Sequence, residues 1–134
     1  MAGYSSTPLI RKLGIKPKAR LLFVDSPANF AETLGSLPDD VNIVATAGDP
    51  VDFVLVFVEA SLSLRQQFAG LAARLVPDGM LWVAWPKKAA KTSTDLTEIV
   101  VRQIGLDAGL VDVKVCAIDE KWSGLKFVIR VQDR

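Results

Sequence analysis

The sequence predicts a three-layer α/β fold with a mostly parallel sheet and a C-terminal antiparallel hairpin. Apolar runs of strand length at 20–25, 41–46 and 51–58 precede or alternate with helix-like segments, and continuous apolar strands of this kind are typical of parallel sheets buried on both faces. The last quarter instead alternates apolar and polar residues, around 113–115 and over 125–131. That period of two marks half-exposed strands. Strands separated by helices, followed by a hairpin, indicate this fold class.

Length and composition favour one domain over residues 1–134. Half of the 134 residues are apolar, which is enough for one sizeable core. Sixteen basic and fifteen acidic residues leave a formal charge of +1, so no overall field favours nucleic acid or a membrane surface. The N-terminal residues lack a signal-peptide pattern, and Cys116, the single cysteine, has no partner in the chain for a disulfide. We therefore expect a cytoplasmic protein without a membrane segment.

The sequence contains no histidine, and this excludes several kinds of chemistry. A histidine base, a histidine metal ligand and a histidine proton shuttle are all ruled out. No acidic residues have the spacing of a calcium-binding loop. We predict no metal site and no catalytic residues.

Two short helices are predicted around the first strand. Thr7 and Gly14 bracket the first, and the second spans 26–35 with Pro27 near its start. A longer helix follows the third strand, where Ser63 and Gln66 have the spacing of a capping box.

The second half of the chain continues with a turn, a strand and another helix. Residues 76–79 form the predicted turn and 80–85 the strand, in which Trp82 and Trp85 should face opposite sides. Either Thr94 or Asp95 is expected to cap the last helix, which closes at 105–109. The hairpin then turns at 119–124.

Three segments, 13–20, 51–56 and 73–83, resemble the Rossmann-like class I methyltransferases. The resemblance covers nearly the whole chain and implies that fold, without the family's third strand and its helix. The family's glycine-rich loop is replaced by 25–29, where Pro27 removes an N–H donor. The acid that would hold a ribose is also absent from 42–47. The sequence therefore argues against S-adenosylmethionine, and no cofactor is predicted.

Other segments, at 3–5, 85–88 and 119–124, resemble a small bacterial protein family, and this second resemblance implies no activity.

Candidate ligand-binding residues follow the ends of the predicted strands. In open α/β sheets, ligands bind beyond the carboxyl ends of the parallel strands. If the first hairpin strand is parallel to the others, the hairpin loop joins the same edge. The candidate set is Asp25, Glu59, Lys87, Lys88, Asp119 and Trp122.

Each candidate also has a structural interpretation. Lys87, Lys88 and Lys91 form either an anion site beside a helix N-terminus or, as favoured, a solvated loop. Trp122 either stacks on a ligand or folds back over the sheet edge. Asp25 and Glu59 are an acid pair or, as favoured, caps of the helices that follow.

The five basic residues between Arg11 and Arg20 favour a solvated face over nucleic acid. We therefore expect a non-catalytic binding or scaffolding module, with a protein or a small anionic ligand as partner. The alternative is a small-molecule binding protein or enzyme that uses Lys87, Lys88, Asp119 and Trp122. A homodimer through 125–131, expected as the hairpin's outer strand, is a further hypothesis.

Overall fold

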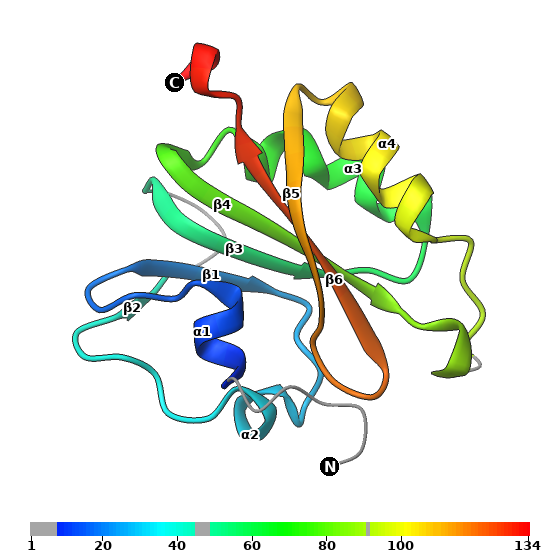
Figure 1. Ribbon diagram of the computed structural model, residues 1–134, viewed down its shortest axis with the longest axis horizontal. Helices are drawn as coiled ribbons and strands as arrows, with labels where there is room; N and C mark the ends of the chain where they lie inside the picture. The colour runs from blue at the N-terminus through cyan, green and yellow to red at the C-terminus, as the bar shows by residue number, and fades with distance from the viewer. Residues whose placement is uncertain (1–7, 45–48, 91) are drawn as a thin grey trace.

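The computed structural model describes residues 8–44, 49–90 and 92–134. Six strands form one sheet in the order β2-β1-β3-β4-β6-β5 (Figure 1). The strands are β1 (Arg20–Val24), β2 (Asn42–Ile43), β3 (Val51–Phe57), β4 (Leu75–Pro86), β5 (Leu110–Ala117) and β6 (Trp122–Ile129). The helices are α1 (Leu9–Leu13), α2 (Phe30–Leu34), α3 (Ser61–Ala72) and α4 (Glu98–Asp107), with 3₁₀ turns η1 (Lys88–Ala90) and η2 (Val131–Asp133).

The sheet has a parallel part and an antiparallel part. Strands β2, β1, β3 and β4 pair in parallel, and β6 pairs antiparallel with both β4 and β5. This confirms the predicted fold class. Residues 125–131 were expected as the outer hairpin strand, at or beside a sheet edge. They are not the outer strand, because β5 forms the edge and β6 lies beside it. Strand β6 lies between β4 and β5, and its Leu125 and Phe127 are fully buried in the core on the α3/α4 face.

Helices cover the two faces of the sheet unequally. Helices α3 and α4 lie on one face, over a mainly aliphatic core that includes Val54, Leu64 and Ile104. The other face carries α1 and α2, each of five residues, over a second core rich in aromatic rings. Trp85 belongs to the first core and Trp82 to the second, which confirms that they face opposite sides.

The C-terminal end of α1 is fixed to β4. The indole Nε1 of Trp82 donates a hydrogen bond of 2.9 Å to the carbonyl oxygen of Leu13. Gly14 then ends the helix with φ +82°, a left-handed conformation, and a Cβ there would lie 3.3 Å from the sulfur of Met80. Both the conformation and the close approach favour glycine at this position.

The helix caps differ from those predicted. Helix α3 begins at Ser61, not Ser63, and its first amide donates to the Asp95 carboxylate at 2.8 Å. Helix α4 begins at Glu98, and the Thr97 hydroxyl accepts from the Val100 amide at 3.2 Å. Asp95 therefore caps α3 across 34 residues of sequence instead of starting α4.

Several boundaries also differ. Strand β2 has only two residues, and residues 45–46 of the predicted strand lie outside the described residues, as does Thr7. The predicted turn at 76–79 is an irregularity inside β4, where the pairing register with β3 shifts. Helix α2 starts at Phe30, after an irregular segment that begins at Asp25.

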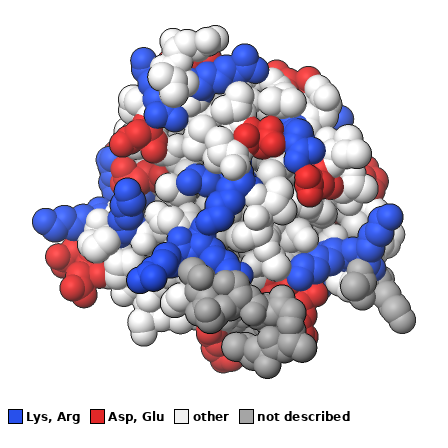
Figure 2. Space-filling model, in the orientation of Figure 1, with Lys and Arg blue, Asp and Glu red and all other residues white. Residues whose placement is uncertain are grey.

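Charged side chains of both signs are spread over the face seen in Figure 2, as the near-zero net charge implies. Within the described part of the chain, every helix is too short or too polar to cross a bilayer, and the longest, α3, has 12 residues.

Candidate functional site

The predicted site residues gather at the carboxyl edge of the parallel strands. Asp25 follows β1, Glu59 comes two residues after β3, and Lys87 follows β4. Because β5 is antiparallel to β6 and β6 to β4, β5 runs parallel to β4. The loop between β5 and β6, which contains Asp119, therefore lies at this same edge.

Three of the six residues line one pocket. Asp25, Glu59 and Trp122 border an open cavity of about 460 Å³, together with Lys121. The remaining lining residues come from the turn after β1, from the end of β3 with the segment that follows it, and from the first turn of α3. They are Pro27, Phe57, Val58, Ala60 and Ser63. An acid pair and one ammonium group are thus brought to the rim of a single cavity.

The other three residues are not part of that lining. The Lys87 amide donates to the carbonyl oxygen of Lys121 at 2.8 Å, which extends the pairing of β4 with the hairpin loop. Lys88 begins η1 and is exposed. Asp119 has a structural contact, since its Oδ1 accepts from the amides of Lys121 and Trp122, each at 2.8 Å. This carboxylate stabilises the turn between the two hairpin strands.

Trp122 folds back over the sheet edge, as one of its two interpretations predicts. Its side chain is only 5% exposed and meets Phe57 edge to face, with ring centroids 5.1 Å apart. Phe57 makes the same kind of contact with Phe30 at 5.0 Å, and Phe30 with Phe23 at 5.7 Å. We call Phe23, Phe30, Phe57 and Trp122 the aromatic row. Two of its rings, those of Phe57 and Trp122, form part of the pocket wall.

Neither acid of the pocket caps a helix, so the favoured interpretation is wrong. The Asp95 carboxylate accepts a hydrogen bond from the first amide of α3, which is the capping contact expected for Glu59. Asn29 precedes α2 and makes no side-chain cap, and Asp25 lies four residues further back. The side chains of Asp25 and Glu59 are both exposed.

The predicted anion site, in which Lys87 and Lys88 act together with a free helix N-terminus, is not formed in the way predicted. Hydrogen bonds from the hydroxyl and the amide of Ser61 lower the pKa of Asp95 below its usual value, so the start of α3 already holds an anion. Thr97 caps α4. Lys91 lies outside the described residues.

The segment after β1 is a tight turn without glycine. Asp25 has φ +56°, a left-handed conformation that is uncommon for a residue with a side chain. Pro27 has no N–H, its carbonyl oxygen accepts from the Phe30 amide at 3.0 Å, and the Asn29 carbonyl accepts from the Thr33 amide. The turn therefore offers few amide donors to a ligand.

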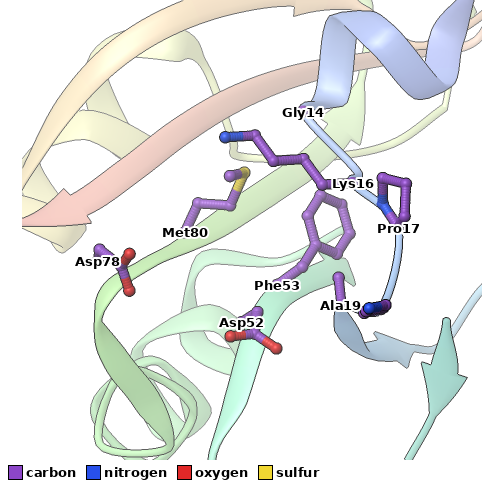
Figure 3. Close-up of a pocket in the computed structure, with 9 residues that line it drawn as sticks. Gly14, Lys16, Pro17, Ala19, Asp52, Phe53, Asp78 and Met80 are labelled. Carbon is purple, nitrogen blue, oxygen red and sulfur yellow. The ribbon is translucent and has the colours of Figure 1, made fainter. Parts of the chain in front are cut away.

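A second cavity, of about 240 Å³, opens at the opposite edge and was not predicted (Figure 3). Arg20 at the start of β1 and Asp52 on β3 form an ion pair beside it, with Nε and Oδ2 3.1 Å apart. The Arg20 amide also donates to Asp52 Oδ2 at 2.8 Å. Burial alone would raise the pKa of Asp52, but the hydrogen bonds and charge of Arg20 lower it. The lining residues are Gly14, Lys16, Pro17, Lys18, Ala19, Asp52, Phe53, Asp78 and Met80.

No metal centre is found among residues 8–44, 49–90 and 92–134, where no three His, Cys, Asp or Glu side chains are grouped to hold an ion. Burial raises the pKa of the Cys116 thiol, although the charges of Lys12 and Lys114 oppose this. Raising that pKa disfavours the reactive thiolate.

Comparisons with known proteins identify the fold. No family model matches the chain, and no curated protein matches it. Among solved structures it is similar to a SAM-dependent methyltransferase from Aquifex aeolicus, with 16% identity, a TM-score of 0.60, and coverage of 89% of this chain and 86% of that one. It is also similar to the fibrillarin pre-rRNA processing protein of Methanococcus jannaschii, with 14% identity, a TM-score of 0.61, and coverage of 95% and 70%.

A third similar structure is magnesium protoporphyrin IX methyltransferase from Synechocystis with bound SAM, at 12% identity, a TM-score of 0.57, and coverage of 90% and 74%. At these identities the likeness shows the Rossmann-like methyltransferase fold alone. This agrees with the resemblance found in the sequence.

Proposed function

We propose that this chain is a non-catalytic binding module on a methyltransferase-like fold, that it does not use S-adenosylmethionine, and that it acts in the cytoplasm. The observation that carries the proposal is the aromatic row at the carboxyl edge of the sheet. Buried rings of Phe30, Phe57 and Trp122 contact one another where an α/β fold of this kind would leave space for a ligand.

The turn after β1 supports the same proposal. A bound nucleotide-like cofactor needs backbone N–H groups aimed at it, and these usually come from a glycine-rich loop and the start of a full-length helix. Here Pro27 has no N–H to donate, and Asp25 has a left-handed backbone conformation that glycine would adopt without strain. Helix α2, which follows the turn, has only five residues. Neither the turn nor the helix therefore resembles the backbone N–H donors that such a cofactor needs.

The side chains at this edge also offer little for catalysis. The sequence has no histidine, and Asp119 is engaged in its turn. Asp25 and Glu59 remain as the acids of the pocket, and both are exposed to water. An effective acid or base near neutral pH usually needs a buried or charge-perturbed environment.

Calorimetric titration of the whole chain with S-adenosylmethionine and with S-adenosylhomocysteine tests this proposal. We expect no heat of binding up to millimolar ligand, while a methyltransferase measured in the same buffer binds both. The variant Pro27→Gly, which restores an N–H and flexibility, should not gain binding while the aromatic row is intact. A dissociation constant in the low micromolar range for the native chain would overturn the proposal.

A second candidate function rests on the cavity of about 460 Å³. It is open, and the carboxylates of Asp25 and Glu59 face it with only Lys121 to balance them. Lys87 and Lys88 are outside its lining, so a small amine-bearing ligand fits this cavity better than an anion does. A thermal-shift screen of biogenic amines would favour this function if a hit disappears in the double variant D25N/E59Q and is retained in D78N.

A further inference from the structure

A cluster of lysines lies on the α1 side of the sheet, away from the carboxyl edge. Lys12 is in α1, Lys16 follows that helix, Lys114 is on β5 and Lys126 is on β6. We call these four residues the lysine cluster. The Lys114 ammonium donates to the carbonyl oxygen of Lys12 at 2.9 Å. Lys114 and Lys126 are register partners on the two hairpin strands. Burial, together with the charges of Lys114 and Lys16, lowers the pKa of Lys126.

The cluster has no acidic partner within the part of the chain that the structure describes. The ion pairs found there join Arg20 to Asp52 and Arg102 to Glu98 and Asp112, so they involve none of the four lysines. Figure 2 shows basic side chains across the middle of this face, with acidic side chains mainly to either side. In a chain of net charge +1, this is a local excess of positive charge.

The fold holds these lysines together by specific contacts. The hydrogen bond from Trp82 to Leu13 fixes α1 on β4, and Lys126 is the register partner of Trp82 on the next strand. Gly124 and Lys126 alternate with the buried Leu125 and Phe127, so the Lys126 side chain faces the α1 side. Like charges kept close without counter-charges destabilise a fold, since they repel one another. An anionic ligand would remove that repulsion.

Lys16 connects the cluster to the cavity of about 240 Å³. Its side chain passes over Met80 at the rim, and Lys18 belongs to the same lining (Figure 3). Asp52 and Asp78 lie elsewhere on this lining, so the positive potential is strongest at the Lys16 end. A ligand could therefore place phosphate groups on the lysines and a small remaining part in the cavity.

We propose that the lysine cluster binds a small ligand that carries several phosphate groups. Ammonium groups on flexible stems are suited to phosphate oxygens as point charges. Nucleic acid is disfavoured, because single-strand binding relies on exposed aromatic rings that stack on bases. None of the aromatic side chains of the described residues is exposed.

The test is a calorimetric titration of the whole chain with inorganic triphosphate at about 20 mM salt, where screening is weak. We expect a dissociation constant on the order of 0.1–1 mM, typical of a few charge-assisted contacts. The double variant K16Q/K126Q should weaken binding at least tenfold. The matched control K87Q/K88Q removes the same charge at the carboxyl edge and should leave the affinity within twofold.

Each other outcome overturns the inference. Failure to bind triphosphate would do so, and so would an equal loss in both double variants, which would indicate net charge alone. A single-stranded RNA of 20 nucleotides that binds more than tenfold tighter than triphosphate would point to nucleic acid instead. If K16Q/K126Q fails to fold, two other measurements replace it. The variant K16R/K126R should bind triphosphate with native-like affinity, and NMR of the native chain should show the pKa of Lys126 rising when triphosphate is added. Loss of affinity in K16R/K126R together with an unchanged Lys126 pKa would overturn the inference.

This inference goes beyond the proposed function, and the two can fail separately. S-adenosylmethionine binding would overturn the proposed function without affecting the lysine cluster. The absence of triphosphate binding would remove the inference and leave the carboxyl edge unchanged.

Discussion

The two faces of the sheet are covered in different ways. On one face α3 and α4, of 12 and 10 residues, pack on a largely aliphatic core. On the other face two five-residue helices cover a core that includes Phe30, Phe53, Phe57, Trp82 and Trp122. A short helix buries little area, so wide rings supply the apolar contact that longer helices supply on the first face. The aromatic row therefore accompanies the short α2, and its rings Phe57 and Trp122 form part of the wall of the cavity at the carboxyl edge.

The largest effect is expected on the α3/α4 face, where a glycine of α4 lies against a buried ring. A Cβ at Gly105 in α4 would lie 2.0 Å from Cε1 of Phe127, a ring that is fully buried and stacked edge to face on Phe68 at 5.3 Å. Gly105→Ala should lower the free energy of unfolding by about 3 kcal/mol, because the ring has no space to move. Urea denaturation measures this.

Gly70 in α3 provides the matched control. Nothing lies within 4 Å of a Cβ built there, and the residue is exposed. Gly70→Ala should raise the free energy of unfolding by about 0.5–1 kcal/mol, since alanine is the better helix former. Equal effects of the two substitutions would contradict the view that this face is closely packed.

A smaller effect is expected from the ring that fixes α1 on the other face. Trp82→Phe removes buried volume and leaves the Leu13 carbonyl without its indole partner, so we expect a loss of about 2 kcal/mol. Amide hydrogen exchange should speed up in α1 more than in α3 and α4. Trp85→Phe, on the opposite face, should lose stability without this local effect. If W85F loosens α1 as much as W82F does, the hydrogen bond to Leu13 is not what holds the helix.

Local patterns in the sequence were sufficient to predict much of the fold. The apolar runs at 20–25 and 51–58 and the alternation at 125–131 correspond to β1, β3 and β6. Each pattern depends on the burial of its own segment, and burial determines residue type directly. The same reasoning placed Trp82 and Trp85 on opposite faces, because a strand alternates its side chains.

Contacts between residues far apart in the sequence could not be predicted from these local patterns. Asp95 reaches the start of α3, and Arg20 pairs with Asp52, only because the folded chain brings them together. Of the six candidate residues, Asp25, Glu59 and Trp122 line one cavity, because Asp25 and Glu59 follow the ends of β1 and β3 and Trp122 begins β6 at the same edge. The lysine cluster could not be predicted, because its members come from segments that are far apart in the sequence. Lys114 and Lys126 looked like ordinary polar positions of a hairpin until the position of α1 over them was known.

The smallest effect concerns the Arg20–Asp52 ion pair, where β1 and β3 begin next to one another. The pKa of Asp52 is lower in the folded chain than the ordinary value of 3.8, so the folded state binds that proton less readily than the unfolded state. The stabilisation is therefore fully present above about pH 4 and is lost as the pH falls through the folded pKa. Both side chains are more than a third exposed, so solvent screening keeps the contribution of the ion pair small.

Asp52→Asn should lower stability slightly at pH 7 and should flatten the decline in stability as the pH falls below about 4, because the group that gains the proton is gone. Asp78→Asn is the matched control. It lines the same cavity and forms none of the ion pairs found among the described residues, so its acid profile should follow that of the native chain. Guanidinium chloride screens the pair, so urea titrations at a series of pH values are the appropriate measurement. If D52N and D78N give the same acid profile, the Arg20–Asp52 ion pair makes no measurable contribution to stability at this edge.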